Sequence, residues 1–196
     1  MDCMTIEGFV EQLASAAPTP GGGSVSALVA ALSGALSCMV ANITLSKTAD
    51  LELASWRSAL VEGYKGALGD IQRDIEAYRD VVEAQKQPKG SEARTTAVQG
   101  ALKKAAVVPL EIAGRAISLL HLALQVAPHA RSSYASDLAV ANILGLAAVR
   151  SALLNVETNL RYIKDDSFVQ RFTQLVAEMK SDAEATSARI EKALPR

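Results

Sequence analysis

The sequence predicts an all-α protein, a single multihelical domain of long antiparallel helices. Hydrophobic residues make up 49% of the 196 residues but aromatic residues only 4%, so the apolar content is mostly Ala, Leu and Val. That composition favours closely packed helices over a sheet, which needs more aromatic and β-branched residues. Apolar residues recur at helical spacing, and no segment alternates with a period of two. We therefore expect one helical domain over residues 1–196, with enough length to bury a real core.

The first half of the chain contains three predicted helices. The first covers about residues 5–16 and is stopped by a loop rich in proline and glycine. The second covers 24–46, with Ser24 as its expected N-cap. It is apolar on most faces and should lie at the centre of the fold. The third covers about 50–87, with apolar residues at helical spacing and charges between them, and it ends at Pro88.

Three more helices are predicted in the second half. The fourth covers 91–126, and Pro109 inside it should kink or split it near Val107. The fifth begins at a cap supplied by Ser133 or Ser136 and continues to about residue 164. The sixth is amphipathic and ends at about residue 192. Its cap is one of three neighbouring residues, Asp165, Asp166 or Ser167.

Small residues occupy more than one face of the second and fifth helices, which permits close approach of their backbones. A helix that is apolar all round needs cover on every side, and a second subunit can provide part of that cover. We therefore expect a homodimer.

Charge and cysteine content exclude several classes of protein. The net charge is -1 and the pI is about 6.1, whereas nucleic-acid-binding proteins carry a basic excess. Cys3 and Cys38 cannot be assigned to a disulfide from sequence, and two lone cysteines suit a reducing cytoplasm. No Cys/His cluster has the spacing of metal ligands, so we expect no metal site.

The segment from residue 12 to residue 46 contains no charged residue and is long enough to span a bilayer. It is rich in Ala and Ser, however, contains Asn42, and lacks a positive flank on its N-terminal side. It also has no basic region typical of a signal peptide. We expect a buried helix of a soluble protein that does not associate with a membrane.

The segment from Thr19 to Ser24 is a candidate binding site, because three consecutive glycines, residues 21–23, precede the central helix. Glycines leave backbone N–H groups unshielded, and the N-terminus of a helix attracts anions and hydrogen-bond acceptors. The alternative is a plain linker before a core helix. The segment alone does not decide between the two.

Two further groups of polar residues lie on helices. Asp70, Asp74 and Tyr78 share one face of the third helix, where an ion-paired surface with Arg73 and Arg79 is the simpler explanation. On the fifth helix, Asp137 lies near the N-terminus, and Asn155 and Asn159 lie one turn apart. Asp137 and Asn155 are 18 residues apart on one face, hence about 27 Å apart, and cannot touch one reacting atom in the same subunit. Either they hold opposite ends of a long ligand, or they belong to different sites, or a dimer brings copies of them together.

Other polar residues have simple structural explanations. A mildly basic stretch around Pro88 is either ordinary surface or a docking area for a substrate carboxylate. Its residues are Lys86, Lys89, Arg94, Lys103 and Lys104. We expect His121 and His129 to be structural and Cys38 to be a buried, inert thiol.

Taken together, four blocks resemble the cyclodeaminase/cyclohydrolase family of folate enzymes, in that family's order and over nearly the whole chain. They are residues 9–13 with 18–24 and the run to 44; residues 74–78 through 88–89; residues 105–111; and residues 136–141 with 152–156, 159–160 and 164–165. No single block is decisive, but four in register are specific. The resemblance implies an all-helical dimer that acts on a tetrahydrofolate carrying a one-carbon unit, with no metal or redox cofactor.

The resemblance also implies roles for particular residues. Gly21, Gly22, Gly23 and Ser24 would hold the pterin or a substrate carbonyl through backbone N–H groups. Asp74 or Asp137 would be the catalytic acid/base. The remaining substrate-binding candidates are Tyr78, the amides Asn42, Asn155 and Asn159, and the cations Lys47 and Lys89, which would meet the glutamate tail.

Two reactions fit the resemblance. A cyclodeaminase converts 5-formiminotetrahydrofolate into 5,10-methenyltetrahydrofolate and ammonia, and a cyclohydrolase opens the methenyl compound to 10-formyltetrahydrofolate. Three loops depart from the family's pattern: residues 45–49, the stretch after Pro88, and residues 131–135. Because these departures affect the substrate entrance, a non-catalytic helical dimer that binds folate is a third alternative.

Overall fold

The computed structural model describes residues 5–195, and every regular element in that range is a helix. Two 3₁₀ turns, Ala127–His129 and Ser132–Tyr134, connect the fourth and fifth helices. The α-helices are α1 (Ile6–Leu13), α2 (Gly22–Leu45), α3 (Leu51–Gln85), α4 (Glu92–Val126), α5 (Ala135–Leu160) and α6 (Asp166–Ala193). The predicted all-α class is confirmed.

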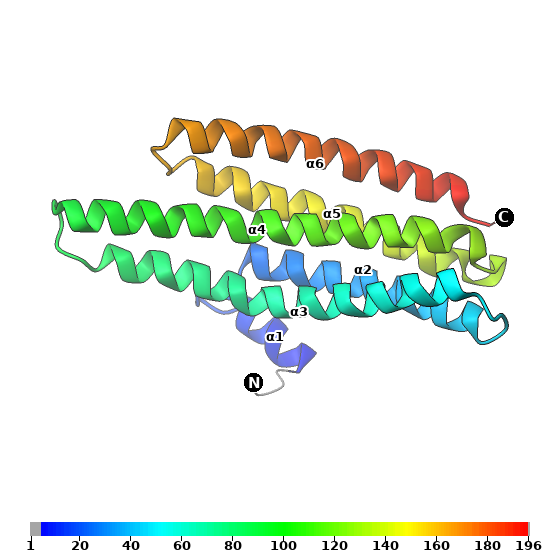
Figure 1. Ribbon diagram of the computed structural model, residues 1–196. Coiled ribbons are helices and arrows are strands. Elements are labelled where there is room, and N and C mark those ends of the chain that lie inside the picture. Colours follow the sequence, from blue (N-terminus) through cyan, green and yellow to red (C-terminus); the bar gives the residue numbers. More distant parts are fainter. Residues whose placement is uncertain (1–4, 196) are drawn as a thin grey trace.

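Helices α2 to α6 run roughly antiparallel to their neighbours along the chain and form an elongated bundle (Figure 1). Helix α4 packs against each of the other four, and α2 lies between α3 and α5. The α3–α4 hairpin extends beyond the first turn of α2 and the last turn of α5 (Figure 1). The start of α2 therefore lies part of the way along the bundle, between two longer helices.

The core consists largely of alanine and other small side chains, as the composition predicts. Ala27, Ala30 and Ala148 are fully buried. At Gly145 of α5, a Cβ atom would come within 2.6 Å of Leu120 Cδ2 on α4. Close approach of backbones, rather than large side chains, fills the interior between α2, α4 and α5.

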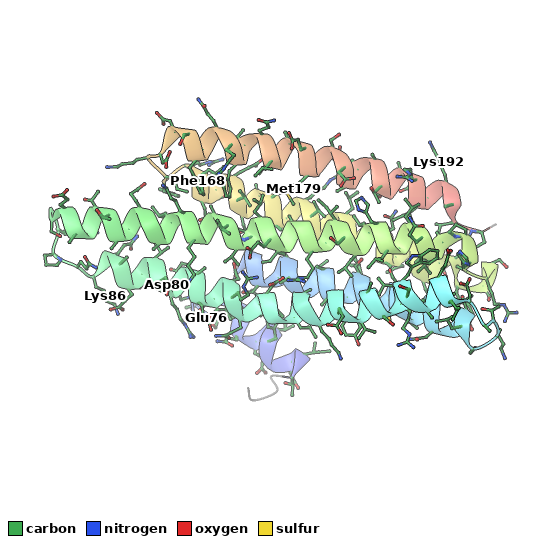
Figure 2. All side chains as sticks on the ribbon, viewed as in Figure 1. Glu76, Asp80, Lys86, Phe168, Met179 and Lys192 are labelled. Carbon is green, nitrogen blue, oxygen red and sulfur yellow. The ribbon has the colours of Figure 1, made fainter. Side chains whose placement is uncertain are left out.

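Helix α6 covers one side of the bundle with larger side chains. Phe168 stacks on Phe172, with ring centroids 4.0 Å apart, and the Lys103 ammonium of α4 lies 5.4 Å from the centre of the Phe168 ring. Further along, Met179 Cε comes near Gly114 of α4. Figure 2 shows Phe168 and Met179 on the side of α6 that faces α4.

Side chains cap most of the helices. Thr5, Asp50, Ser91 and Asp165 accept hydrogen bonds from backbone N–H groups in the first turns of α1, α3, α4 and α6. Two predicted caps are wrong. Helix α2 begins before Ser24, with Gly21 as its N-cap, and α5 begins at Ala135 after Tyr134, so neither Ser133 nor Ser136 caps it.

Pro109 does not split α4, which continues as one helix from Glu92 to Val126. Pro109 is buried among the other helices. The prediction of a break near Val107 is therefore wrong. An interior proline leaves one backbone carbonyl without its helical partner, and tertiary contacts satisfy that carbonyl here, as described below.

Three helical segments are long and apolar enough to cross a membrane by length and composition: Gly22–Leu45, Glu92–His129 and Ser132–Leu160. They pack against one another inside the bundle, and 61%, 50% and 44% of their most apolar windows are buried. Much of their apolar surface therefore forms the core. The large hydrophobic side chains of these segments that are exposed lie on α2 and α5.

Candidate functional site

The candidate site is centred on the first turn of α2. Gly21 is the N-cap and contributes no side-chain hydrogen bond, and the first backbone bond within the helix runs from Val25 N–H to the Gly21 carbonyl. The N–H groups of Gly22, Gly23 and Ser24 therefore have no partner within the helix. They form the positive end of the dipole of a 24-residue helix.

A carboxylate from α3 faces this helix end. Ser24 Oγ donates a hydrogen bond of 2.7 Å to Asp74 Oδ2. Burial raises the pKa of Asp74 above its usual value, and the hydroxyl and backbone N–H of Ser24 oppose that rise by stabilising the ionised form. Asp74 is thus a partly buried carboxyl that holds its proton more strongly than an exposed aspartate does.

Gly23 is what allows Asp74 to come so close. A Cβ atom at Gly23 would lie 2.0 Å from Asp74 Oδ1, so any other residue at this position would displace the carboxylate. The glycine run is therefore more than a flexible linker, because one of its members provides the space for the carboxylate. Of the two sequence interpretations of this segment, the geometry favours the site.

Asn155 of α5 borders the same helix end on the opposite side. A Cβ atom at Gly22 would lie 3.3 Å from Asn155 Oδ1. Asn155 Nδ2 donates to the Ser151 carbonyl, and Ser151 Oγ accepts a hydrogen bond of 2.9 Å from Ser26 Oγ. These serine contacts fix α5 against α2 and place the side-chain amide of Asn155 beside Gly22.

Tyr78 and Asn159 lie one turn beyond Asp74 and Asn155. Tyr78 is 42% exposed on α3. Asn159 Nδ2 donates a 2.7 Å hydrogen bond to the carbonyl of Ala105, four residues before Pro109. This is the carbonyl that the proline deprives of its helical donor. One N–H of the Asn159 amide therefore has a structural role, which leaves its other N–H and its oxygen for a ligand.

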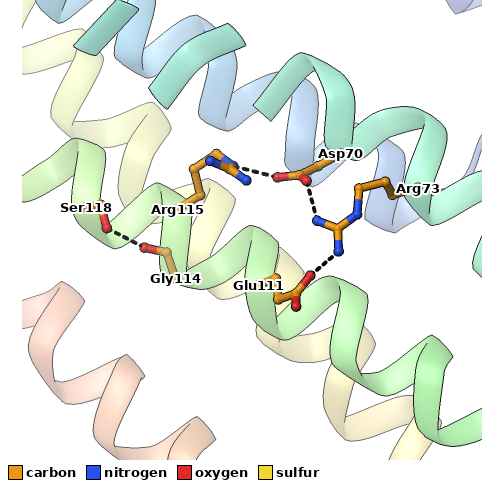
Figure 3. Close-up of polar contacts among 6 residues, drawn as sticks. All are labelled: Asp70, Arg73, Glu111, Gly114, Arg115 and Ser118. Carbon is orange, nitrogen blue, oxygen red and sulfur yellow. Dashed lines mark hydrogen bonds and ion pairs between the residues drawn. The ribbon is translucent and has the colours of Figure 1, made fainter. Parts of the chain in front are cut away.

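Asp70 belongs to an ion-pair network rather than to the candidate site. It is 1% exposed and accepts hydrogen bonds of 2.8 Å from Arg73 and 2.7 Å from Arg115. Arg73 also pairs with Glu111 of α4 (Figure 3). The simpler sequence explanation, an ion-paired face, is right for Asp70. The network fixes α3 against α4 one turn from Asp74.

Asn42 and Asp137 lie at the opposite end of the α2–α5 pair. The two helices are antiparallel, because Gly22 meets Asn155 while Ser33 bonds to the carbonyl of Ala141. Asn42 is 20 residues from Gly22, hence about 30 Å along α2. Within one chain, Asn42 and Asp137 therefore cannot contact a ligand bound at the glycines. The expected grouping of these residues with Asp74 is corrected on this point.

Lys47 and Lys89 are also far apart. Lys47 precedes α3 and Lys89 follows it, and the 35 residues of α3 span about 52 Å. They cannot bind one glutamate tail in the same chain. Lys89, at the end of the α3–α4 hairpin, is on the Asp74 side of the bundle.

The remaining polar candidates have structural partners. His121 Nε2 lies 3.1 Å from Asp182, and His129 Nδ1 lies 3.0 Å from Asp50. Cys38 is buried in α2, and burial raises its pKa. Cys3 lies outside the described residues. Within residues 5–195 no three His, Cys, Asp or Glu side chains gather as metal ligands would.

Sequence reasoning missed three contributors: the Ser26–Ser151 contact, the pairing of Asn159 with the Ala105 carbonyl, and the contact of Arg115 with Asp70. The proline inside a long helix was a usable signal for the second, because it requires a donor for one carbonyl. The other two depend on the register between helices.

Comparisons with known proteins agree with this geometry. The family model described as formiminotransferase-cyclodeaminase matches residues 5–178. A methenyltetrahydrofolate cyclohydrolase of Methylorubrum extorquens is 34% identical over 194 residues, covering 95% of this chain and 93% of that protein. A formimidoyltransferase-cyclodeaminase of Gallus gallus is 32% identical over 188 residues, which are 92% of this chain but only 35% of that longer protein.

A solved structure has the same fold. The crystal structure of a formiminotetrahydrofolate cyclodeaminase from Thermotoga maritima superposes with a TM-score of 0.88 at 30% sequence identity, covering 97% of this chain and 95% of that one. The family match spans most of the chain, and the relatives named here are enzymes of folate one-carbon chemistry. The chain therefore belongs to the formiminotransferase-cyclodeaminase family.

Proposed function

We propose that this protein is a 5-formiminotetrahydrofolate cyclodeaminase. In this reaction N10 of the substrate attacks the formimino carbon, the bond from that carbon to its terminal nitrogen breaks, and ammonia leaves. The product is 5,10-methenyltetrahydrofolate. The observation that carries the proposal is Asp74, a partly buried carboxyl with a raised pKa, hydrogen-bonded to Ser24 at the N-terminus of α2, where Gly21 provides no side-chain cap.

One carboxyl group can serve both proton transfers. When the substrate enters as the formimidinium cation, the proton that N10 loses equals the proton that the departing nitrogen gains. A carboxylate at Asp74 accepts the first and returns it as a carboxylic acid. The raised pKa supports the acid half of this cycle, since it makes the carboxyl hold its proton more strongly than an ordinary aspartate does. No second aspartate is required, which removes the need for Asp137.

The neighbouring groups bind and orient the substrate. The N–H groups of Gly22 and Gly23 would bind a carbonyl or ring acceptor of the pterin, beside the Ser24 N–H that already faces Asp74. Asn155 Oδ1 would accept a hydrogen bond from a ring N–H group, and Tyr78 would border the ring. Lys89, rather than Lys47, would meet the glutamate tail. The reaction as written needs no metal or redox cofactor.

Methenyltetrahydrofolate cyclohydrolase is the second candidate. The protein with that name in M. extorquens is 34% identical over 93% of its own length. At the same site the ionised Asp74 would take a proton from the attacking water, and the helix end would stabilise the tetrahedral intermediate. The third alternative from sequence, a non-catalytic folate-binding dimer, would retain the binding groups but show no turnover. The expected cytoplasmic homodimer remains part of the proposal.

The absorbance of 5,10-methenyltetrahydrofolate tests the proposal. With the formimino substrate, the wild-type protein should produce that absorbance. Faster decay of the added methenyl compound would instead identify the cyclohydrolase, and neither change, with folate still bound, would identify the non-catalytic protein.

The substitution Asp74→Asn should lower turnover at least about a hundredfold, because the acid/base is removed while the hydrogen-bonding shape remains. Asp137→Asn is the matched control, an aspartate in a first helical turn that should keep near-normal turnover. Equal turnover in the wild type and in Asp74→Asn would refute the assignment of the acid/base.

A further inference from the structure

The half of α3 that carries Asp74 buries no large apolar side chain. After Leu60, the buried residues of this helix are Ala67, Asp70, Ala77 and Ala84. A methyl group makes few interlocking contacts, so alanines alone leave a helix free to pack in several rotations about its axis. Asp70 is the one residue of these four that makes side-chain hydrogen bonds. It is therefore the candidate for the group that fixes the rotation of α3 beside the site.

Two guanidinium groups hold the Asp70 carboxylate. Arg115 of α4 donates from Nε to Asp70 Oδ2 at 2.7 Å, and Arg73 donates to Oδ1 at 2.8 Å. Figure 3 shows the carboxylate between the two arginines, with Glu111 of α4 paired to Arg73. Charge-assisted bonds to a planar guanidinium are directional. They therefore restrict the rotation of α3 as well as its distance from α4.

Gly66 provides the space for Arg115. A Cβ atom at Gly66 would lie 2.4 Å from Arg115 Nη1. Gly66, Asp70 and Asp74 follow one another at intervals of four residues and share one face of α3. Along this face come first the space for the guanidinium, then the carboxylate that binds it, and then the candidate acid/base.

Stability alone does not account for the Asp70–Arg115 pair. Removing two charges from water costs about as much as their attraction returns, so apolar residues of similar size often hold helices together equally well. Apolar residues do not fix direction in the same way. A rotation of α3 by about 10° would move an atom about 5 Å from the helix axis by about 1 Å. A misplacement of about 1 Å at a reacting group can cost about a hundredfold in rate.

We propose that Asp70 and Arg115 are positioning residues, which hold the Asp74 carboxyl against Gly23 and Ser24 in the orientation that proton transfer requires. Neither residue contacts the substrate, and both act through Asp74. The inference rests on the proposed function, because that function assigns the proton transfers to Asp74.

The kinetic signature of this role is a loss in kcat rather than in KM. The N–H groups proposed to bind the pterin lie on α2, and the Asn155 amide lies on α5. A small rotation of α3 leaves these groups in place but moves Asp74 relative to the bound substrate. Loss of the pair should therefore lower kcat much more than it raises KM.

The double variant Asp70→Leu/Arg115→Met tests the role, because it replaces the pair by apolar side chains while Arg73 keeps Glu111. Its urea-unfolding midpoint should equal or exceed that of the wild type. Its kcat should fall at least about tenfold, with KM within about threefold. A purely structural pair would instead give a lower midpoint and an unchanged kcat for the folded protein.

Two further variants support the test. Asp80→Leu is the matched control, because Asp80 also joins α3 to α4, 2.6 Å from Lys104 Nζ, but at an exposed position. It should keep near-normal kcat. Gly66→Ala displaces the Arg115 guanidinium without removing a charge and should lower kcat in the same direction as the double variant. It keeps the proposal testable if the double variant does not fold.

A kinetic double-mutant cycle shows whether the pair acts through Asp74. In an Asp74→Asn protein, replacing Asp70 and Arg115 should lower the residual kcat no further, because the group that they position is already lost. An equal fractional loss in both backgrounds would contradict the proposed role.

NMR provides a measurement without substrate. The N–H of Ser24 faces Asp74, so its exchange with solvent reports the position of the carboxyl. This amide should exchange faster in the double variant than in the wild type, and at the wild-type rate in Asp80→Leu. If that change is seen but the wild type converts neither folate substrate, the proposed function fails and the placement of Asp74 by the pair stands.

Three results would overturn the inference. One is a folded double variant with wild-type kcat. Another is a Ser24 amide that exchanges equally fast in the double variant and the wild type. The third is an Asp80→Leu protein that loses as much kcat as the double variant, which would mean that any contact between α3 and α4 has the same effect.

Discussion

At the scale of single residues, the site depends on the absence of one side chain. Gly23 leaves room for the Asp74 carboxylate, which a Cβ atom would approach to 2.0 Å. Ser24 then meets the same carboxylate through its hydroxyl group. The glycines thus provide space for neighbouring groups as well as a flexible backbone. Each of the three positions faces a different neighbour.

The substitution Gly23→Ala should therefore displace Asp74 and lower turnover at least about tenfold, with some loss of stability. Gly69→Ala is the control, because this glycine is also helical but a Cβ atom there meets nothing within 4 Å. It should keep full turnover and gain about 0.5–1 kcal/mol of stability by removing a helix-interior glycine. Steady-state kinetics and urea unfolding measure both. Unchanged turnover in Gly23→Ala would mean that Asp74 is free to move without consequence.

At the scale of helices, a side-chain hydrogen bond joins α5 to α4 at the point where a proline interrupts the backbone hydrogen bonds of α4. Pro109 removes one helical hydrogen bond, and Asn159 replaces the missing donor at the Ala105 carbonyl. Because Asn155 lies one turn earlier on α5, the same contact fixes the part of α5 that borders Gly22. The two amides on α5 therefore have different roles: Asn155 borders the candidate site, and Asn159 bonds to α4.

A double-mutant cycle tests this explanation. Asn159→Ala alone should cost about 1–2 kcal/mol, since it leaves a carbonyl without a donor. Pro109→Ala returns a backbone N–H at position 109, so Asn159→Ala in that background should cost about 1 kcal/mol less. Urea unfolding of the four proteins gives the coupling. Equal costs in both backgrounds would show that Asn159 does not compensate for the proline.

At the scale of the whole molecule, the sequence predicts the helices better than it predicts their partners. Periodicity and the Pro/Gly breaks place all six helices within a few residues of their observed ends, because these signals are local. The errors at Ser24 and Ser136 are also local, since several adjacent residues were able to act as the cap. The predicted split at Pro109 is wrong because a tertiary donor compensates for the proline.

The candidate site was predicted only in part, for a physical reason. Asp74 and Gly23 are 51 residues apart, and their contact depends on the register between α2 and α3, which no local pattern encodes. The helical rise was sufficient, however, to show that Asp137 and Asn155 cannot meet within one chain. The helical rise also separates Asn42 from Gly22, because the two residues lie at opposite ends of α2.

The candidate site also affects the pH dependence of the stability of the whole fold, and the direction of the pKa shift of Asp74 sets the sign of that dependence. Its pKa is raised in the folded state, so both states are protonated at low pH and the folded protein loses stability as pH rises through the folded pKa. Asp74→Asn cannot ionise. Its unfolding temperature should match the wild type below about pH 3.8, the ordinary value, and exceed it at neutral pH.

Asp165 gives the opposite sign and provides the control. Hydrogen bonds from Lys103, Ser167 and the Phe168 N–H hold the pKa of Asp165 well below its usual range. Its contribution is present above the ordinary pKa and fades as pH falls. Asp165→Asn should therefore unfold at a lower temperature than the wild type at neutral pH, and the difference should shrink in acid.

Thermal unfolding by circular dichroism from acid to neutral pH measures both variants. A neutral-pH stability of Asp74→Asn at or below the wild type would show that ionised Asp74 is not strained by burial, and the acid half of the proposed mechanism would lose its support.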